Sequence, residues 1–559
     1  DCVRGGTETP ADLEESVDHS ADIVIAGAGH NGLVAGAYLA KAGLRVVVLE
    51  GRDVIGGGAT TEELTLPGFL HDPYSTGHFG ILGNPIFSRD EIPLAKYGLT
   101  YVAPDPVVAL PTDRGSIAIW HDDSRTAAEF AKYSAKDAAA WRELCRDWTL
   151  LAPAVGKIVG NPPAVAGQSV PTGAIARLRE FVGLSRKVLS AMSPMQAAKM
   201  QAVNTSSALD VIESRFESSE VRMVLTWLVA ITCQPVDRPG TGALAIALPA
   251  PLSRAGWVNA IGGAIALPNA LSAYIRDNGG AVVAGARVDR FLIDQGRAVG
   301  ARTVDGRTFR GERAVLSSLH FTQLPDLVPG FDLPRAYLDG AKRWEAGPGL
   351  FLVHLAVERN PLVRSGDAAL PSVLTGSISP GGLRRQLASV AAGVAATNPD
   401  IWLLAACSTI VDPTRAPAGK GVVKMMTMAP YALDGDPRNW AAYKDEYADF
   451  LVKTYAASVV GFQPGDELAR LAVSPADVAA TNPSFFGGSP QGGHALAAQA
   501  GANRPVAGWA SYRSPVPGLF QTGLSTHPGG AVNGWSGRNA ARALLADLGM
   551  DADALIPPI

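Results

Sequence analysis

The sequence predicts an α/β protein with two domains, one of which is discontinuous. At roughly 150 residues per domain, 559 residues are too many for one compact unit. A buried strand, a glycine-rich turn, a helix and a second buried strand follow one another over residues 22–50, which is a βαβ unit. Further strand patterns occur over residues 281–316. A strand, a glycine-rich loop and a helix follow one another over residues 518–548. We therefore expect a Rossmann-type domain built from separated stretches, beside a mixed α+β domain.

The predicted boundaries follow these stretches. Residues 1–20 are acidic and polar, and we expect a flexible N-terminal arm. The Rossmann-type domain is predicted to comprise residues 21–85, 255–330 and 496–559. The second domain, expected to bind the substrate, comprises residues 86–254 and 331–495.

Composition excludes several classes of protein. With 48 Lys and Arg against 52 Asp and Glu, the chain has no excess of positive charge to hold nucleic acid. Charged residues make up 18% of the chain, against about 25% in ordinary globular proteins, which suggests large interfaces or an internal route for an apolar molecule. Cys2, Cys145, Cys233 and Cys407 form no C-x-x-C pair, so a zinc ribbon, an iron–sulfur site and a dithiol redox motif are excluded.

The expected location is the cytoplasm, with peripheral contact to a membrane surface as an alternative. Widely spaced cysteines fit a reducing compartment, and residues 1–20 lack the apolar core of a signal peptide. Long charge-free stretches are interrupted by Gly, Pro and Asn, so none is interpreted as a membrane span. A helical stretch at 175–200 is rich in Arg and Lys. It fits either peripheral contact with lipid headgroups or the solvated face of a packed helix.

The βαβ unit contains the first candidate binding residues. Its loop runs from Gly27 through Ala28, Gly29 and Asn31 to Gly32, directly before an Ala- and Leu-rich helix. A glycine triplet alone is weak evidence, but here each glycine has a physical task. Gly27 permits the tight turn, Gly29 lets the backbone approach a pyrophosphate, and the helix N-terminus offers N–H groups to the anion.

Glu50 ends the second strand, where a carboxylate can accept hydrogen bonds from a ribose diol. Two further features favour FAD over NAD. Arg52 and the bare loop with Gly57 and Gly58 follow at the position expected for the second half of a dinucleotide. The loop from Gly523 through His527 and Val532 then leads into a helix and can direct amides toward the edge of a flavin.

From Asp22 onward these residues resemble the phytoene-desaturase-like flavoproteins, which include carotenoid desaturases, β-carotene ketolases and retinol saturases. The most specific segments are Gly56–Glu62 and the run from Thr526 to Ala541. Segments 398–400 and 411–417 resemble most the ketolase and mitochondrial-type branch. The resemblance implies that Val288 holds adenine through its backbone. It also implies that the rest of FAD is held by Gly27, Gly29, Gly32, Glu50, Arg52, Gly57, Gly523 and Val532.

This chain departs from the family pattern at two positions. Gly58 stands where carotenoid desaturases carry an arginine. Trp535 places a bulky ring where a smaller side chain is expected beside the flavin, which argues against a channel of carotenoid size.

The expected chemistry is transfer of a hydride from an apolar or amphipathic small molecule to noncovalent FAD. No cysteine lies near the flavin loop to form a thioether, and no second glycine-rich βαβ unit offers an NAD(P)H domain. The flavin would therefore be reduced by the substrate and reoxidised by oxygen, a quinone or another partner. Candidate proton-handling groups are His527, Tyr74 and His78; for each, the alternative is a residue without a catalytic role, which the sequence favours for Tyr74 and His78.

The reacting carbon is predicted to lie over the flavin ring at the end of an apolar passage, bounded by His527 and Trp535 on the carboxy-terminal side. The stretch from Gly240 to Ile275 contains Arg254 as its only charged residue and is expected to line that passage. Two alternatives stay open. One is an amine or amino-acid oxidase in which Trp509, Tyr512 and Trp535 form an aromatic cage. The other is a flavin-bound interaction protein without turnover. The oligomeric state is left open.

Overall fold

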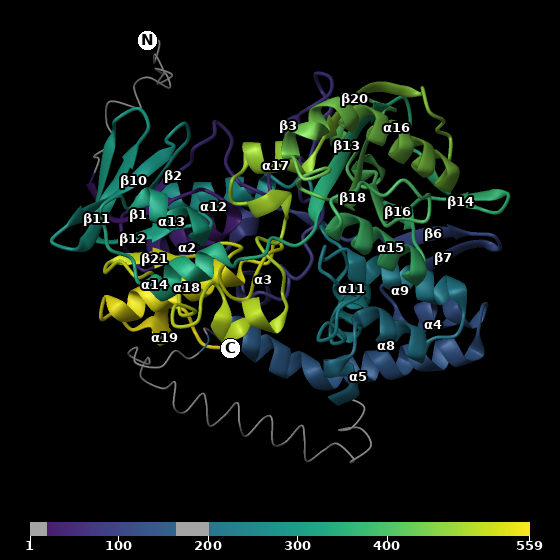
Figure 1. Cartoon of the computed structure of the whole chain (residues 1–559), viewed down its shortest axis with the longest axis horizontal. Helices are drawn as coiled ribbons and strands as arrows, with labels where there is room; N and C mark the ends of the chain where they lie inside the picture. Colours follow the sequence, from purple (N-terminus) through teal and green to yellow (C-terminus); the bar gives the residue numbers. More distant parts are fainter. Residues whose placement is uncertain (1–19, 162, 164–200) are drawn as a thin grey trace, which may run out of the picture.

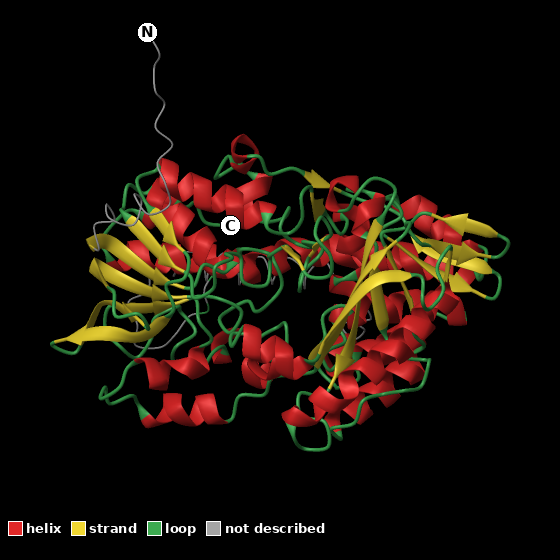
Figure 2. Cartoon of the chain, turned by 90° about the horizontal axis from the view of Figure 1, so that it is seen from above, coloured by secondary structure: helices red, strands yellow, loops and turns green. Residues whose placement is uncertain are grey.

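The computed structural model describes residues 20–161, 163 and 201–559. Apart from Ser20, the predicted N-terminal arm lies outside the described residues, and so does the basic stretch 175–200. The chain forms two units, each built on a sheet (Figure 1). Figure 2 shows the two sheets at opposite ends of the molecule, with loops and helices between them. This is the α/β class that the sequence predicts.

The first unit contains a seven-stranded sheet. Its strands are β1 Ser20–Ala26, β2 Val46–Leu49, β9 Ala281–Val283, β10 Val288–Asp294, β11 Arg297–Thr303, β12 Thr308–Ser317 and β21 Leu519–Gln521. The order is β10-β11-β12-β1-β2-β9, and β21 runs parallel to the end of β12. β12, β1, β2 and β9 are mutually parallel, whereas β10 and β11 form an antiparallel extension. The sheet thus joins strands from three distant stretches of sequence.

Helices cover both faces of this sheet (Figure 1). On one face, Ile23 and Ile25 pack into a core shared with α2 (His30–Lys41), α12 (Ala266–Asp277) and α18 (Trp535–Asp547). On the other face, Val24 and Ala26 pack into a core shared with α13 (Leu324–Leu327) and α14 (Arg335–Lys342). A central parallel strand buried on both faces explains why residues 23–26 are continuously apolar.

The second unit contains a five-stranded antiparallel sheet in the order β16-β17-β18-β13-β20. Its strands are β13 Gly349–Val357, β16 Leu374–Ser377, β17 Leu403–Ala406, β18 Gly421–Ala429 and β20 Glu467–Val473. One face packs on α16 (Trp440–Ser458) through Phe351, Val353 and Met425. The other face carries Leu350, Leu404 and Met426 and turns toward the space between the two units.

Most helices of the second unit pack below this sheet (Figure 1). They are α4 Asp123–Ala131, α5 Ala135–Gly160, α8 Ala208–Arg215, α9 Ser219–Ala230, α10 Leu244–Ala247, α11 Pro249–Ala255 and, beside them, α15 Pro380–Ala391. Smaller elements are α3 Pro85–Ser88, α17 Pro475–Thr481, α19 Ala552–Leu555, β3 Glu62–Glu63, β4 Leu70–His71, β5 Tyr101–Val102, β8 Asn259–Ala260, β14 Leu362–Ser365, β15 Ala368–Leu370 and β19 Val459–Val460. This unit also contains a hairpin of β6 Val108–Thr112 and β7 Gly115–Ile119, which turns at Asp113 and Arg114 just before Gly115, whose φ is +119°.

Candidate functional site

A cavity lies between the two units, where the carboxyl ends of β1 and β2 face the second sheet. Its lining comes from distant parts of the chain, including the turn after β1, the end of β2, strand β18 and the loop around Gly523. The crevice beyond the carboxyl ends of parallel strands is the usual ligand position in α/β proteins. The cavity therefore occupies the place that the fold offers to a dinucleotide.

The turn between β1 and α2 has the close packing that its glycines predict. Gly27 adopts φ +93°, and a Cβ on Gly32 would lie 2.2 Å from the carbonyl oxygen of Gly27. A Cβ on Gly57 would lie 3.1 Å from the Cα of Gly29, so the two glycine loops lie directly against each other. None of the described side chains caps the start of α2, and its first turn carries no acidic residue. The N–H groups at this helix end remain available to an anion.

Glu50 connects these two loops. Its Oε2 accepts a hydrogen bond from the Ala28 N–H and its Oε1 accepts one from the Arg52 N–H, both at 3.0 Å. Burial raises the pKa of the Glu50 carboxyl, while the backbone donors oppose that shift. Arg52 forms an ion pair with Glu62 at 2.9 Å and also lines the cavity. The carboxylate is thus held in place at the cavity wall, where it can accept further hydrogen bonds.

The structure brings most of the predicted cofactor residues together. The residues in the cavity wall are Gly27, Gly29, Asn31, Glu50, Arg52, Gly57, Gly58, Val288, Gly523 and Val532. Ala28 and Gly32 lie behind the wall: Ala28 donates to Glu50, and Gly32 packs against Gly27. These glycines, the carboxylate and the uncapped helix end form a surface that fits the phosphates and ribose of a dinucleotide.

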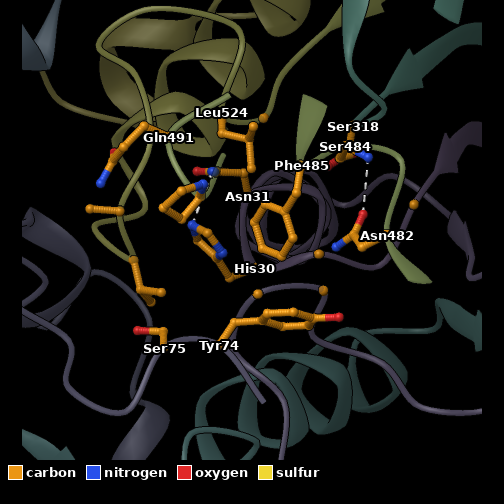
Figure 3. Close-up of a pocket in the computed structure, with 18 of the residues that line it drawn as sticks. His30, Asn31, Tyr74, Ser75, Ser318, Asn482, Ser484, Phe485, Gln491 and Leu524 are labelled. Atoms are coloured by element: carbon orange, nitrogen blue, oxygen red, sulfur yellow. Dashed lines mark hydrogen bonds between the residues drawn. The ribbon is translucent and has the colours of Figure 1, made fainter. Parts of the chain in front are cut away.

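His30 lines the same wall, although the sequence reasoning did not single it out. A 3.0 Å hydrogen bond joins its Nε2 to the Asn31 Nδ2 (Figure 3). Burial lowers the pKa of His30 to about 4, so its ring is neutral at pH 7. Its place inside the glycine turn was the available signal, because a side chain next to such a turn lies close to any bound dinucleotide.

The four predicted catalytic residues are not brought together. Tyr74 lines the cavity and packs edge-on against Phe485, with ring centroids 4.8 Å apart (Figure 3). His78 is buried beside the wall, and a 2.8 Å hydrogen bond joins its Nδ1 to the Tyr101 hydroxyl. His78, His527 and Trp535 are absent from the described residues that line the cavity.

The predicted position of the reacting carbon, bounded by His527 and Trp535, is therefore corrected. The His527 ring points away from the cavity, with its Nε2 at 2.8 Å from the Ile158 carbonyl oxygen, so it binds α5. Trp535 is the first residue of α18, and its ring lies against the end of α5, close to Gly160. Both side chains fill the contact between α5 and residues 523–535, which we call the flavin-loop segment. Packing of α5, which the local sequence does not reveal, decides their direction.

The proposed aromatic cage is also absent from the described cavity wall, since Trp509, Tyr512 and Trp535 do not line it. Tyr512 donates its hydroxyl to the His527 carbonyl at 2.8 Å, and Trp509 packs against Tyr337. From the apolar stretch 240–275, Trp257 alone among the described residues reaches the cavity. The rest of that stretch is apolar because α11 and α12 are core helices, and α12 packs beside α2.

The half of the cavity away from Glu50 is apolar. Its walls are formed by Phe79, Ile231, Cys233, Trp257, Leu350, Leu404, Met426, Phe485 and Leu524. Lys424 lies among these apolar side chains, and the other charged residues of the described wall are Glu50, Arg52 and Arg287. Lys424 extends from β18, is 5% exposed, and donates a hydrogen bond to the Tyr74 carbonyl. Burial lowers the pKa of Lys424 to about 8, an effect that Asp72 opposes and Arg415 reinforces.

Sequence reasoning missed Lys424. The available signal was a lysine inside the run Val422–Ala429, because a charge in a fully buried apolar strand requires a special reason. Asp72 and Arg415 form a buried ion pair at 2.8 Å near it. Asp72 also accepts hydrogen bonds from the Thr61 hydroxyl at 2.7 Å and the Ala264 N–H at 3.0 Å. These bonds connect the ion pair to the first unit.

Comparisons with known proteins agree with this geometry. Residues 25–84 match the NAD(P)-binding Rossmann-like domain. The chain is 30% identical over 556 residues to pyridine nucleotide-disulfide oxidoreductase domain-containing protein 2 of Mus musculus, covering 94% of each protein. The chain belongs to this oxidoreductase family. It is also 27% identical over 557 residues to a subunit of the limonene dehydrogenase of Castellaniella defragrans, covering 95% of each protein.

Solved structures show the same two-unit fold. An oxidoreductase from Methanosarcina mazei aligns with a TM-score of 0.57 and 16% identity, covering 94% of this chain and 99% of that one. Putrescine oxidase bound to putrescine aligns with a TM-score of 0.58 and 14% identity, covering 95% and 99%. At such identities the likeness concerns the fold alone. This family member is an oxidoreductase with a site for FAD or NAD(P), which sets aside a protein without turnover.

The described ranges contain neither a membrane-spanning helix nor a metal site. No helix of residues 20–161 and 201–559 is long and apolar enough to cross a membrane. Over the same residues, no group of His, Cys, Asp and Glu is placed to hold a metal ion.

Proposed function

We propose that the chain binds FAD noncovalently and oxidises an uncharged, apolar small molecule held over the second sheet. The glycine loops, Glu50 and the start of α2 support binding of the adenosine and pyrophosphate groups. The wall continues from them to Gly57, Gly523 and Val532, which favours a cofactor longer than one nucleotide. When bound, FAD supplies a two-electron acceptor that takes hydride from a C–H bond.

Noncovalent attachment is supported by the state of the cysteine in the wall. Cys233 lines the apolar half, and burial raises the pKa of its thiol to about 12. A thiol that stays protonated is a poor nucleophile. Acid denaturation should therefore release the whole flavin into the supernatant.

The observation that carries the substrate class is the charge of Lys424 in the apolar half. A protonated amine there would face Lys424 without a described carboxylate to balance it, since Glu50 lies at the other end of the cavity. An uncharged molecule avoids this repulsion and can pack against the apolar side chains of the wall. The Castellaniella relative is named for limonene, an uncharged hydrocarbon, and we extend that class of substrate to this chain. The amine-oxidase alternative has no comparable support in the cavity.

This chain's own residues would position the substrate and keep it dry. Tyr74 and Phe485 form one side of the apolar half, and Trp257 stacks on Phe79 with ring centroids 5.8 Å apart. A dry, shaped pocket favours direct transfer of hydride over loss of reducing equivalents to water. The electrons are proposed to leave to oxygen, a quinone or a partner protein, and peroxide release in air would identify oxygen.

Anaerobic bleaching of the bound flavin tests the proposal. Limonene should bleach it, whereas putrescine and cyclohexylamine should not. Bleaching by the amines alone would overturn the argument from Lys424, and recovery of NAD(P) in place of FAD from the purified protein would overturn the cofactor assignment.

A further inference from the structure

Lys424 lies between the cavity and a group of buried polar side chains. On β18 it is the direct partner of His354 on the antiparallel strand β13, so both side chains leave the sheet on the cavity side. The charged and titratable groups that act on the Lys424 amine or its histidine neighbours are Asp72, Arg415, His30, His71, His78 and His354. The Tyr74 carbonyl accepts a hydrogen bond from the amine and directs it toward the cavity wall.

The surroundings of Lys424 lower the cost of deprotonating its amine. Asp72 already has a cationic partner in Arg415 at 2.8 Å, and both side chains are almost completely buried. That carboxylate therefore cannot be counted as a dedicated counter-ion for an ammonium on Lys424. The pKa of Lys424, lowered to about 8 by burial, leaves the amine mainly cationic at pH 7 with a neutral fraction of roughly a tenth, which grows to about half at pH 8. A neutral amine at a dry wall can accept a proton.

His354 and His71 continue from Lys424 toward the surface. His354 is fully buried, and neither ring nitrogen has a hydrogen-bond partner among the described residues. Its ring centroid lies 5.4 Å from that of His71, whose Nε2 is 2.8 Å from the Thr65 hydroxyl. Thr65 is half-buried, so the row ends near solvent. Burial lowers the pKa of His354 well below its ordinary value and that of His71 to about 4, so both rings stay neutral, and each would pass a proton by accepting it at one ring nitrogen while releasing one from the other.

We propose that Lys424 is the base that accepts the proton released when the substrate is oxidised, and that His354 and His71 pass this proton toward Thr65. This inference rests on the proposed function. When a substrate loses two hydrogens from adjacent atoms, one leaves as hydride with both electrons, and flavin is the oxidant that accepts it. The other leaves as a proton to the Lys424 Nζ, and the electrons of that broken bond form the new double bond. The ammonium then returns its proton through the histidines.

The first experiment measures anaerobic flavin bleaching by limonene in the holoenzyme between pH 6 and 10. The wild-type rate should rise with pH through about 8 and then level off, because the neutral amine is the active form. Lys424→Met should lower the rate by about 10²–10⁴-fold and abolish this pH dependence, and added methylamine should restore part of the rate. Lys420→Met is the matched control, because Lys420 pairs with Glu358 on the exposed side.

A second variant tests the histidines separately. His354→Phe keeps the ring volume and should retain FAD while slowing proton release to a pH indicator relative to flavin bleaching. Proton release that stays synchronous with bleaching in His354→Phe would overturn the path. A wild-type rate and pH profile in Lys424→Met would overturn the base.

A substrate-free measurement keeps the result separate from the proposed function. Competitive acetylation of the holoenzyme with acetic anhydride, read by mass spectrometry, reports the fraction of neutral Lys424 at each pH. Half-maximal labelling near pH 8 is expected. Labelling with an ordinary lysine profile, or no labelling at any pH, would overturn the assignment of Lys424. If limonene fails to bleach the flavin while labelling shows the shifted profile, the substrate class fails and the Lys424 assignment stands.

Discussion

Among single side chains, Glu50 links the greatest number of features of the nucleotide half. Its two carboxylate oxygens hold the N–H groups of Ala28 and Arg52, and its free lone pairs face the cavity. The same carboxylate would position both the turn before α2 and a ribose. Lys424, by contrast, contributes a positive charge to the cavity wall. The two ends of one cavity thus differ in polarity.

Replacement of Glu50 by Ala should weaken FAD binding. Each hydrogen bond to a charged group is worth about 1.5–3 kcal/mol, so loss of two ribose contacts should reduce affinity by more than about tenfold. The measurement is the flavin-to-protein absorbance ratio after dilution and gel filtration. Glu63→Ala is the control, because Glu63 is exposed and accepts a hydrogen bond from the nearby Gly68 N–H, away from the cavity wall. Full flavin occupancy in diluted Glu50→Ala would contradict the assignment.

Replacement of Trp257 by Leu should enlarge the apolar half and extend the substrate range to bulkier uncharged molecules. Trp257 is 6% exposed, lines the cavity, and stacks on Phe79. Bleaching rates across a series of hydrocarbons of increasing size measure the change, with the FAD content unaltered. Trp535→Leu serves as the comparison, since Trp535 is similarly buried but lies outside the described wall. Equal size limits in both variants would place the substrate elsewhere.

At the level of elements, the start of α2 depends on contacts between backbones. Gly32 belongs to the first turn of the helix, and the Gly27 carbonyl occupies the space that any side chain would need. The glycine loop 56–58 then packs on this turn through the Gly56 N–H, which donates to the Ala28 carbonyl at 2.9 Å. The geometry at the cavity wall is therefore set by two loops that exclude each other's side chains.

Replacement of Gly32 by Ala should displace the turn before α2 and abolish FAD binding. A Cβ at 2.2 Å from a carbonyl oxygen cannot be accommodated without moving the backbone. Gly156→Ala is the matched control: Gly156 lies inside helix α5, and no described atom lies within 4 Å of its added Cβ. That control should be neutral or more stable by roughly 0.5–1 kcal/mol, because Ala favours a helix over Gly. Flavin content and the thermal midpoint separate the two variants.

Across the whole molecule, buried ion pairs hold together segments that are distant in sequence. Arg415 and Asp72 link the loop before β18 to the first unit, and Arg538 on α18 pairs with Glu91 at 2.8 Å. Tyr38 on α2 also donates to Glu91, at 2.6 Å. Helix α18 is thereby fixed against α2 of the first βαβ unit, and this contact brings the loop of Gly523 to the cavity.

Replacement of Glu91 by Gln should destabilise the protein by about 3–5 kcal/mol, since it leaves the buried Arg538 charge uncompensated. Burial alone would raise the pKa of Glu91, but its hydrogen bonds from Arg538 and Tyr38 lower it below the ordinary 4.5. The stabilisation is therefore present above pH 4.5 and is lost as pH falls through the folded-state value. Thermal midpoints of both proteins should differ at pH 7 and converge on acidification. A constant difference would contradict the assigned cause.

The sequence by itself determined the residues that act through the backbone or at the end of a strand. Gly27, Gly29, Gly57, Glu50 and the loop at Gly523 were predictable because local turn geometry, strand periodicity and family resemblance all concern neighbouring residues. The α/β class followed from the same local patterns.

Only the tertiary structure decided which side chains face the substrate. The directions of His527 and Trp535 depend on α5, whose contact with the flavin-loop segment joins residues more than 360 positions apart. Lys424 enters the cavity because β18 pairs with β13 and presents alternate side chains to the space between the units. Local sequence specifies a strand and its two faces, but the face that meets the cofactor is set by long-range packing.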